Sequence, residues 1–400
     1  MRTTLRTRAG WIGLAVSACT LVGGAALAAT TTDRPGSILI FPKVVTTGTR
    51  DTVIQVTNTG NMPGDVRCFY LDGQTCLETD FDLSLTRQQP TVWDAEAGRR
   101  VDPRDSEAGL DPGLVPPLPA NYQGALVCVE VDTSDMPMIR NQLKGEATIT
   151  DRSGTFSQNS VSKYNAVAVQ GITSSGDPNT LTLDNKEYSA CPASLVVDFN
   201  RTGQDGVVQG LGNGGRCIGG VNPGAGCNNN TQCPGNPGIP IPAGTCSNAA
   251  GTSNALTRVT VVPCNLDFST VTRTNVTLEL LRSDETEVTL SGGIPQFACW
   301  ASFLIDDAFK PVGTPGNNPC TTPYCTAGIR STAGGPVVGV AETFVSDSLA
   351  NTASAAVDLH TRGVCSLNAG NSYCNRDQDC PAGFGTCVFT QPSVIQVPAH

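Results

Sequence analysis

The chain has 400 residues, 39% of them hydrophobic, which is enough for more than one packed core. Its formal net charge is −10. Nucleic acid and anionic lipid surfaces repel so acidic a protein, so the composition excludes nucleic acid as a partner.

Residues 1–28 have the pattern of a secretory signal peptide. Arg2, Arg6 and Arg8 precede an uncharged apolar run over 11–27, and Ala26 and Ala28 form an A-x-A cleavage site. The run is short for a membrane span, and no later segment could cross a bilayer, so we expect no transmembrane span. Cleavage removes three arginines and takes the formal charge from −10 to −13. In one alternative, residues 16–19 form a lipobox and Cys19 carries a lipid anchor.

A four-cysteine pattern occurs twice in the chain. The first copy, cassette 1, has Cys217, Cys227, Cys233 and Cys246; the second, cassette 2, has Cys365, Cys374, Cys380 and Cys387. In both, proline follows the third cysteine and the sequence Gly-Thr-Cys closes the copy. Neither copy has enough aliphatic residues for a core, so disulfide bonds must hold it. Of the three possible schemes we predict first-to-third and second-to-fourth pairing within each copy.

Eight other cysteines complete an even set of 16 after cleavage, as expected in an oxidising compartment. We predict bridges within single domains: Cys68 with Cys76, Cys128 with Cys191, Cys264 with Cys299, and Cys320 with Cys325. Structural zinc sites favour C-x2-4-C knuckles, and only the last pair approaches that spacing. The cysteines therefore indicate disulfides and no metal site.

Apolar and polar residues alternate at period two in many short runs separated by turn residues, which is typical of antiparallel β-sandwiches. The predicted fold is all-β, with two immunoglobulin-like antiparallel β-sandwich domains and two small disulfide-rich insertions. Domain 1 is expected over 29–205, a Gly-rich linker with cassette 1 over 206–252, and domain 2 over 253–360. Cassette 2 is expected as an insertion over 361–390. Residues 391–400 would form the last strand of domain 2, paired with residues 355–359 across cassette 2.

Candidate catalytic residues are few. The histidines are His360 and His400, and no G-x-S-x-G elbow presents a serine to either, so a surface position is expected for His360. Paired cysteines leave no thiol nucleophile. A carboxylate pair for hydrolysis could come from Asp80 and Asp82 or from Asp306 and Asp307, although such clusters are usually solvated faces.

Acidic loops and aromatic side chains are the candidate ligand sites of the sequence. Oxygen-rich side chains and carbonyls of the loops 102–107 and 375–379 could bind calcium. Each loop contains an arginine and neither has EF-hand spacing, so turn chemistry explains them more simply. Trp93, Tyr122 and Tyr324 could form a carbohydrate-binding platform; core packing is the competing interpretation. The sequence predicts no catalytic, cofactor-binding or metal residue.

Several segments resemble a group of uncharacterised exported proteins of environmental Gram-negative bacteria. The similar segments are 36–43 (GSILIFPK), 51–59 (DTVIQVTNT), 79–82 (TDFD), 87–93 (RQQPTVW) and 338–342 (VGVAE). Residues 56–61 also resemble a strand and turn of bacterial immunoglobulin-like surface domains, and the cassettes resemble Cys-rich repeats of secreted proteins. The resemblance implies a secreted location, extracellular or on the outer surface of a Gram-negative bacterium. It transfers no activity, because the group has none assigned.

These observations predict a non-enzymatic secreted or cell-surface protein for adhesion, assembly or ligand binding. The expected partner is a cell-surface or extracellular protein or glycan. The alternative is a secreted hydrolase that acts on polysaccharide through two carboxylates.

Overall fold

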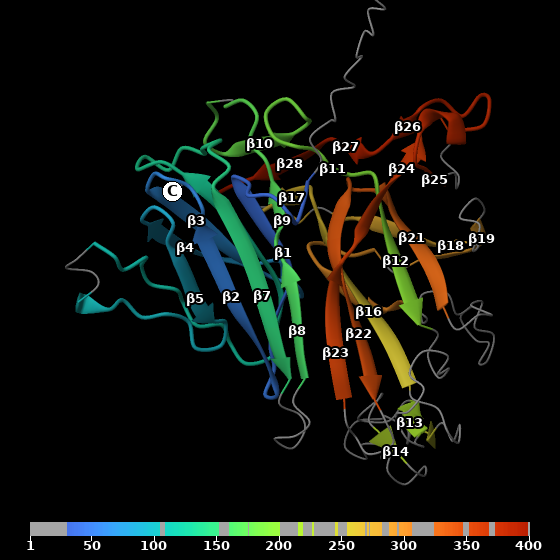
Figure 1. Ribbon diagram of the computed structural model, residues 1–400, viewed down its shortest axis with the longest axis horizontal. Coiled ribbons are helices and arrows are strands. Elements are labelled where there is room, and N and C mark those ends of the chain that lie inside the picture. The colour runs from blue at the N-terminus through green and yellow to red at the C-terminus, as the bar shows by residue number, and fades with distance from the viewer. Residues whose placement is uncertain are drawn as a thin grey trace, which may run out of the picture.

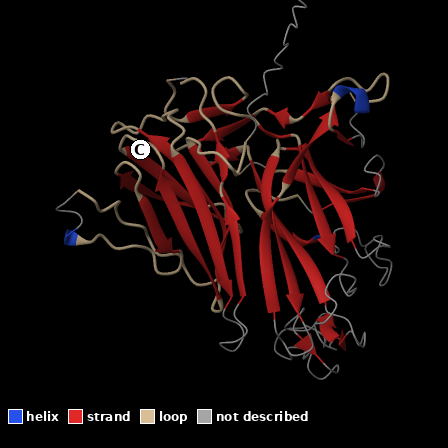
Figure 2. Ribbon diagram, viewed as in Figure 1, coloured by secondary structure: helices blue, strands red, loops and turns tan. Residues whose placement is uncertain are grey.

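A computed structural model shows an all-β protein (Figures 1 and 2). Disulfide bonds cross-link its strands and loops. It describes residues 30–104, 109–151, 160–174, 176–200, 254–268, 270–271, 273–281, 288–293, 296–305, 324–346, 352–367 and 373–398, with the short strands 215–218, 226–227 and 245–246. In this described part, no helix is long and apolar enough to cross a membrane.

The first half of the molecule consists of two sheets packed face to face. One sheet has the order β4-β3-β6-β1-β9 and the other the order β5-β2-β7-β8. The strand bounds are β1 Ile38–Thr46, β2 Arg50–Asn58, β3 Gly64–Asp72, β4 Glu78–Leu85, β5 Pro90–Asp94, β6 Tyr122–Val131, β7 Leu143–Asp151, β8 Ser160–Asn165 and β9 Val167–Val169. All neighbours on these paths are antiparallel.

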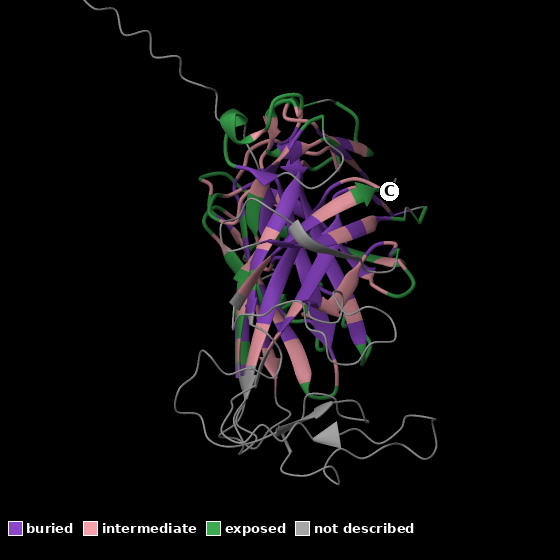
Figure 3. Cartoon of the chain, turned by 90° about the vertical axis from the view of Figure 1, so that its right-hand side faces the viewer, coloured by how far each residue is buried: buried purple, intermediate pink, exposed green. Residues whose placement is uncertain are grey.

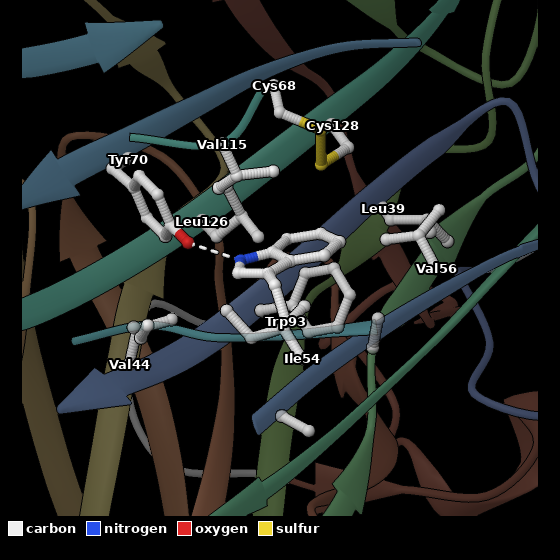
Figure 4. Close-up of a cluster of buried hydrophobic side chains, with 14 of the residues drawn as sticks. Leu39, Val44, Ile54, Val56, Cys68, Tyr70, Trp93, Val115, Leu126 and Cys128 are labelled. Carbon is white, nitrogen blue, oxygen red and sulfur yellow. Dashed lines mark hydrogen bonds between the residues drawn. A yellow bond between two sulfur atoms is a disulfide. The ribbon is translucent and has the colours of Figure 1, made fainter. Parts of the chain in front are cut away.

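Side chains from both sheets fill the first core. Tyr70 and Trp93 lie at its centre, where the Trp93 indole N–H donates to the Tyr70 hydroxyl at 2.6 Å (Figure 4). The Phe81 ring meets both of these rings, at 5.2 and 5.9 Å between centroids. Buried aromatic side chains of this kind need a partner for each polar atom, and the hydrogen bond supplies it.

The second half repeats this arrangement of two packed sheets. One sheet runs β19-β18-β21-β12-β24-β25, with β26 also on β24, and the other runs β20-β16-β22-β23. The bounds are β12 Ser194–Asn200, β16 Asn254–Pro263, β18 Asn275–Leu281, β19 Val288–Gly293, β20 Ala301–Leu304, β21 Tyr324–Ala333, β22 Val337–Ser346, β23 Thr352–Asp358, β24 His360–Cys365, β25 Tyr373–Cys374 and β26 Cys387–Val388. Aliphatic side chains of β12, β16, β18, β21 and β22 form the second core between them.

A third apolar layer, the seam core, joins the two halves. Small sheets cover it: β10 Thr180–Leu183, β28 Ser393–Gln396 and β17 Leu266–Asp267 form one, and β11 Cys191–Pro192 with β27 Thr390–Gln391 forms another. It contains Phe69 of the first half and Phe268 of the second, stacked at 4.8 Å between ring centroids. Figure 3 shows the buried strands running through the body, with exposed residues mainly in the loops.

Strand β1 explains why one sheet can lie between two cores. Leu39 and Phe41 point into the first core, whereas Ile38 and Ile40 point into the seam core. Successive side chains of a strand point to opposite faces, so a continuous apolar run is required where both faces are buried. The segment ILIF is such a run.

The structure differs from the expected domain boundaries at two strands. Residues 194–200 were expected in the first domain, but β12 pairs with β21 and β24 of the second half. The last strand was expected to pair with residues 355–359. Instead β28 pairs with β10 and, in parallel, with β17, while β23 pairs with β22. Both strands are short, so periodicity could not select their partners.

Three disulfides correct the predicted pairing. Cys68 bonds to Cys128, its cross-strand neighbour on β6, and not to Cys76. Cys76 bonds to Cys299 and Cys191 to Cys264, each across the seam between the halves. Cys325 is also disulfide-bonded; Cys320, its predicted partner, lies outside the described residues. The prediction failed because it paired cysteines that are close in the chain or in the same expected domain, whereas two of these three bridges cross between the halves.

Cassette 2 confirms the predicted internal pairing. Cys365 bonds to Cys380 and Cys374 to Cys387, which is first-to-third and second-to-fourth. The cassette adds strands β25 and β26 to β24. Its Tyr373 ring lies so close to Gly328 of β21 that a Cβ atom at position 328 would collide with the ring. In cassette 1 the backbone pairs Cys217 with Cys246 in register. The bridges predicted for this copy involve side chains outside the described part of the structure.

Candidate functional site

A cleft of about 210 Å³, the seam cleft, opens where the two halves meet. Its lining residues are Thr30, Thr31, Thr32, Asp33, Val167, Pro192, Leu195, Val338, Gly339, Asp358, Leu359, His360 and Thr361. The segment 30–33 is held against β9 by two backbone hydrogen bonds between Thr31 and Ala168, at 2.7 and 3.0 Å. The polar side of the cleft therefore comes from a short segment of the first half and from β23 and β24 of the second.

Asp358 is the half-buried carboxyl group of the cleft. Burial raises its pKa to about 6, and the neighbouring Asp33 adds to the rise. Hydrogen bonds from the Thr32 side chain and the Asn165 backbone, together with His360, oppose the shift. The cleft thus has one carboxyl group that changes its charge near pH 6, beside hydroxyl groups that both donate and accept hydrogen bonds.

A second carboxyl group with a raised pKa lies in the first half. Glu130 on β6 is fully buried, and Ser37 donates a hydrogen bond to its Oε2 at 3.2 Å. Burial raises its pKa to about 7, although hydrogen bonds and Arg140 oppose the shift. Its protonated form is therefore favoured by folding at mildly acidic pH.

These two groups predict that mild acid stabilises the protein. A carboxyl group whose folded pKa lies above its unfolded pKa contributes stability below the unfolded value, and loses it as the pH rises through the folded value. We expect the free energy of unfolding to fall by on the order of 2 kcal/mol as the pH rises from about 4.5 to about 7. Urea unfolding at several pH values measures this, and Glu130→Gln should flatten the curve. A stability that rises over this window would contradict the prediction.

A buried ion cluster lies at the seam, apart from the cleft. Lys43 of β1, 2% exposed, pairs with Glu342 of β22, 0% exposed, and Arg50 of β2 donates to the other oxygen of Glu342 at 2.6 Å. Burial lowers the pKa of Lys43 to about 8 against the opposing effect of Glu342. Burial alone would raise the pKa of Glu342, but Lys43 and Arg50 outweigh it and hold it below its usual value. The cluster joins two of the segments that carry the resemblance, 36–43 and 338–342.

One of the two carboxylate pairs considered for hydrolysis, Asp80 and Asp82, lies in the described part of the structure. Asp80 and Asp82 are exposed on β4 at the edge of its sheet, and Arg67 pairs with Asp80 at 3.3 Å. Asp306 and Asp307 lie outside the described residues, as does His400. His360 is exposed, as expected, but it lies at the rim of the seam cleft beside Asp358.

The aromatic platform does not form. Trp93 is 3% exposed and Tyr122 5% exposed, and both lie in the first core; the side chain of Tyr324 is not described. Asp102 caps its own turn by accepting from the Arg104 backbone N–H at 2.9 Å. Asp379 accepts from the Asn375 and Arg376 N–H groups, so turn hydrogen bonds occupy this carboxylate as the sequence suggested. Residues 105–108 of the other loop are not described.

Sequence reasoning missed Asp358 and the segment 30–33. The one available signal was position: residues 30–33 directly follow the predicted cleavage site, and Asp358 ends the alternating run before His360. Neither pattern shows that the two segments meet, because Thr32 and Asp358 are 326 positions apart in the sequence, a distance that only the tertiary fold closes.

Fold and site together define a disulfide-linked all-β protein with a polar cleft at the seam of two halves. No protein-family model matches the chain, and no curated protein is similar to it in sequence. Among solved structures, it has a likeness to the Thermotoga maritima protein 1070 at 8% identity and a TM-score of 0.23, covering 34% of this chain and 95% of that one. A lectin of Pleurotus ostreatus aligns at 10% identity and a TM-score of 0.17, covering 94% of this chain and 89% of that one. At these TM-scores neither likeness bears on fold or function.

Proposed function

We propose that this is an exported, non-enzymatic binding protein built on two immunoglobulin-like β-sandwiches. The observation that carries the proposal is the pair of disulfides, Cys76–Cys299 and Cys191–Cys264, that fastens the halves to each other. Stable disulfides form in oxidising compartments, which supports cleavage of residues 1–28 and a location outside the cell or on its surface. Two halves fixed in this way present a preformed surface, and a preformed surface loses little conformational entropy on binding.

The seam cleft is the proposed binding site. Its volume of about 210 Å³ is below the usual range of about 300–1,000 Å³ for drug-sized ligands, so it suits one small polar unit of a larger partner. Carboxylate and threonine groups match the hydroxyl groups of a sugar, because they accept and donate hydrogen bonds at close range. The proposed partner is a glycan at the cell surface, engaged through one terminal sugar.

The binding proposal is tested with single-atom changes in the cleft. Asp358→Asn keeps the shape of the side chain and removes the charge, and we expect about tenfold weaker binding to immobilised polysaccharide from a Gram-negative cell envelope. Asp82 is an exposed carboxylate on β4, and Asp82→Asn is the matched control, which should bind like the parent. If the parent binds envelope protein and not polysaccharide, a glycan is not the partner. If both variants bind polysaccharide equally well, the seam cleft is not the binding site.

One observation favours hydrolysis as the second candidate. Asp358 and Asp33 line the same cleft, and burial raises the pKa of Asp358 to about 6, the kind of environment that a general acid requires. Release of reducing ends from a polysaccharide, abolished in Asp358→Asn while the fold is kept, would establish the hydrolase in place of the binding protein.

A further inference from the structure

The contact between Lys43 and Glu342 places an amine and a carboxyl group together where water is excluded. The side chains are 2% and 0% exposed, and they come from β1 of the first half and β22 of the second. Tyr164 fixes the backbone of Lys43, since its hydroxyl accepts from the Lys43 N–H at 3.2 Å and donates to the Lys43 carbonyl. Trp300 donates to the Pro42 carbonyl at 2.9 Å, one residue earlier. The amine is thus held against the carboxyl group from several directions.

We propose that Lys43 and Glu342 condense into an intramolecular amide bond that joins the two halves covalently. The bond forms between Nζ of Lys43 and Cδ of Glu342, and the bond from Cδ to Oε2 breaks. One proton passes from the ammonium group to Oε2, the freed amine attacks Cδ, and a second proton from Nζ accompanies Oε2 as it leaves in a water molecule. The ammonium and the carboxylate are consumed together, so the reaction needs no oxidant, activating group or cofactor.

Arg50 is placed to assist this step. Its guanidinium group donates to Oε1 of Glu342 at 2.6 Å, which leaves Oε2 for Lys43. When the amine attacks, negative charge develops on Oε1, and a fixed guanidinium group stabilises such charge strongly in a water-poor site. Arg50 also pairs with Asp151 at 3.5 Å, so its own charge keeps a partner after the carboxylate is gone.

The buried position favours the amide product. In water, condensation of an amine with a carboxylate is opposed by the solvent, but groups held in contact react with effective concentrations of about 10⁵–10⁸ M. An ion pair removed from water also carries a large desolvation cost, and a neutral amide does not. Burial that lowers the pKa of Lys43 to about 8 increases the fraction of neutral amine available near neutral pH.

Mass spectrometry of the mature, reduced and alkylated protein tests the proposal. The intact mass should be lower than the sequence mass by one water molecule. After denaturation and trypsin digestion, one branched peptide should join the segment ending at Arg50 to residues 331–362; neither segment contains cysteine, so no disulfide could link them. Peptide 44–50, which trypsin releases only by cutting after Lys43, should be missing.

Two controls accompany the digest. Lys163 and Glu146 form a pair at 2.6 Å on the surface, with the lysine 57% exposed, and trypsin should cut after Lys163 as usual. Lys43→Arg keeps the positive charge but replaces the nucleophilic amine, so this variant should have its full sequence mass. If it does not fold, the parent protein alone decides: a full sequence mass with release of peptide 44–50 overturns the proposal.

Discussion

Replacing Cys76, Cys299, Cys191 and Cys264 together with serine is expected to lower the free energy of unfolding by about 5 kcal/mol. The two bridges span 223 and 73 residues, and bridges that close long loops restrict the unfolded chain most, by about 2–4 kcal/mol each. The loss should also loosen the seam, where Trp300 lies against Gly73 so closely that a Cβ atom there would meet its ring. Urea unfolding followed by tryptophan fluorescence measures both effects.

The matched control removes a bridge of the same chemistry from cassette 2. Cys374 and Cys387 are 13 residues apart and lie in a unit whose bridges are internal. Replacing both with serine should disorder the cassette locally and leave the main unfolding transition within about 0.5 kcal/mol of the parent. An equal loss in both variants would mean that the seam bridges do not hold the halves together.

Where Lys43 and Glu342 remain an ion pair in the parent protein, with no amide bond between them, Glu342→Gln is expected to cost about 3–5 kcal/mol of unfolding free energy, the usual result of removing one partner of a buried ion pair. The change leaves the buried ammonium of Lys43 and the guanidinium of Arg50 facing a neutral amide, with the desolvation cost of both charges uncompensated. Chemical denaturation of the two proteins side by side measures the difference.

Glu146→Gln is the control for this substitution, because Glu146 also pairs with a lysine but in contact with solvent. Exposed pairs are screened by water, so a change within about 0.5 kcal/mol is expected. Should Glu342→Gln be as mild as this control, the Lys43 and Glu342 pair would contribute nothing to the seam.

The sequence predicted the local structure of this protein well. Period-two alternation predicted short strands, and β2 shows the pattern, because its residues 53–56 alternate between partly exposed and buried positions. The four-cysteine pattern limited cassette 2 to three pairing schemes, and the predicted one, first-to-third and second-to-fourth, is the scheme that the structure shows.

Long-range pairing could not be predicted from the same patterns. Cys68 and Cys76 are close in the chain and flank a turn, yet each bonds to a distant cysteine, because the strands bearing Cys128 and Cys299 lie beside them in the fold. Strand β12 is likewise apolar enough for either half. Which strands and cysteines pair depends on the seam core. This core is assembled from segments throughout the chain, so no short stretch of sequence predicts it.

Only some residues of the candidate site could be predicted from the sequence. His360 was recognised as a surface residue, but its neighbour Asp358 takes its raised pKa from burial and from Asp33, which approaches from the other end of the chain. The Lys43 and Glu342 pair lies in two segments singled out for their resemblance to exported proteins. Nothing in either segment alone indicates that a charged residue there is buried.

Peptide mapping of the mature protein without reduction tests most directly whether disulfides fasten the two halves together. The structure predicts linked peptides that join Cys76 to Cys299 and Cys191 to Cys264, with Cys68 joined to Cys128. Peptides that instead join Cys68 to Cys76 and Cys264 to Cys299 would place every bridge within one half and contradict the account.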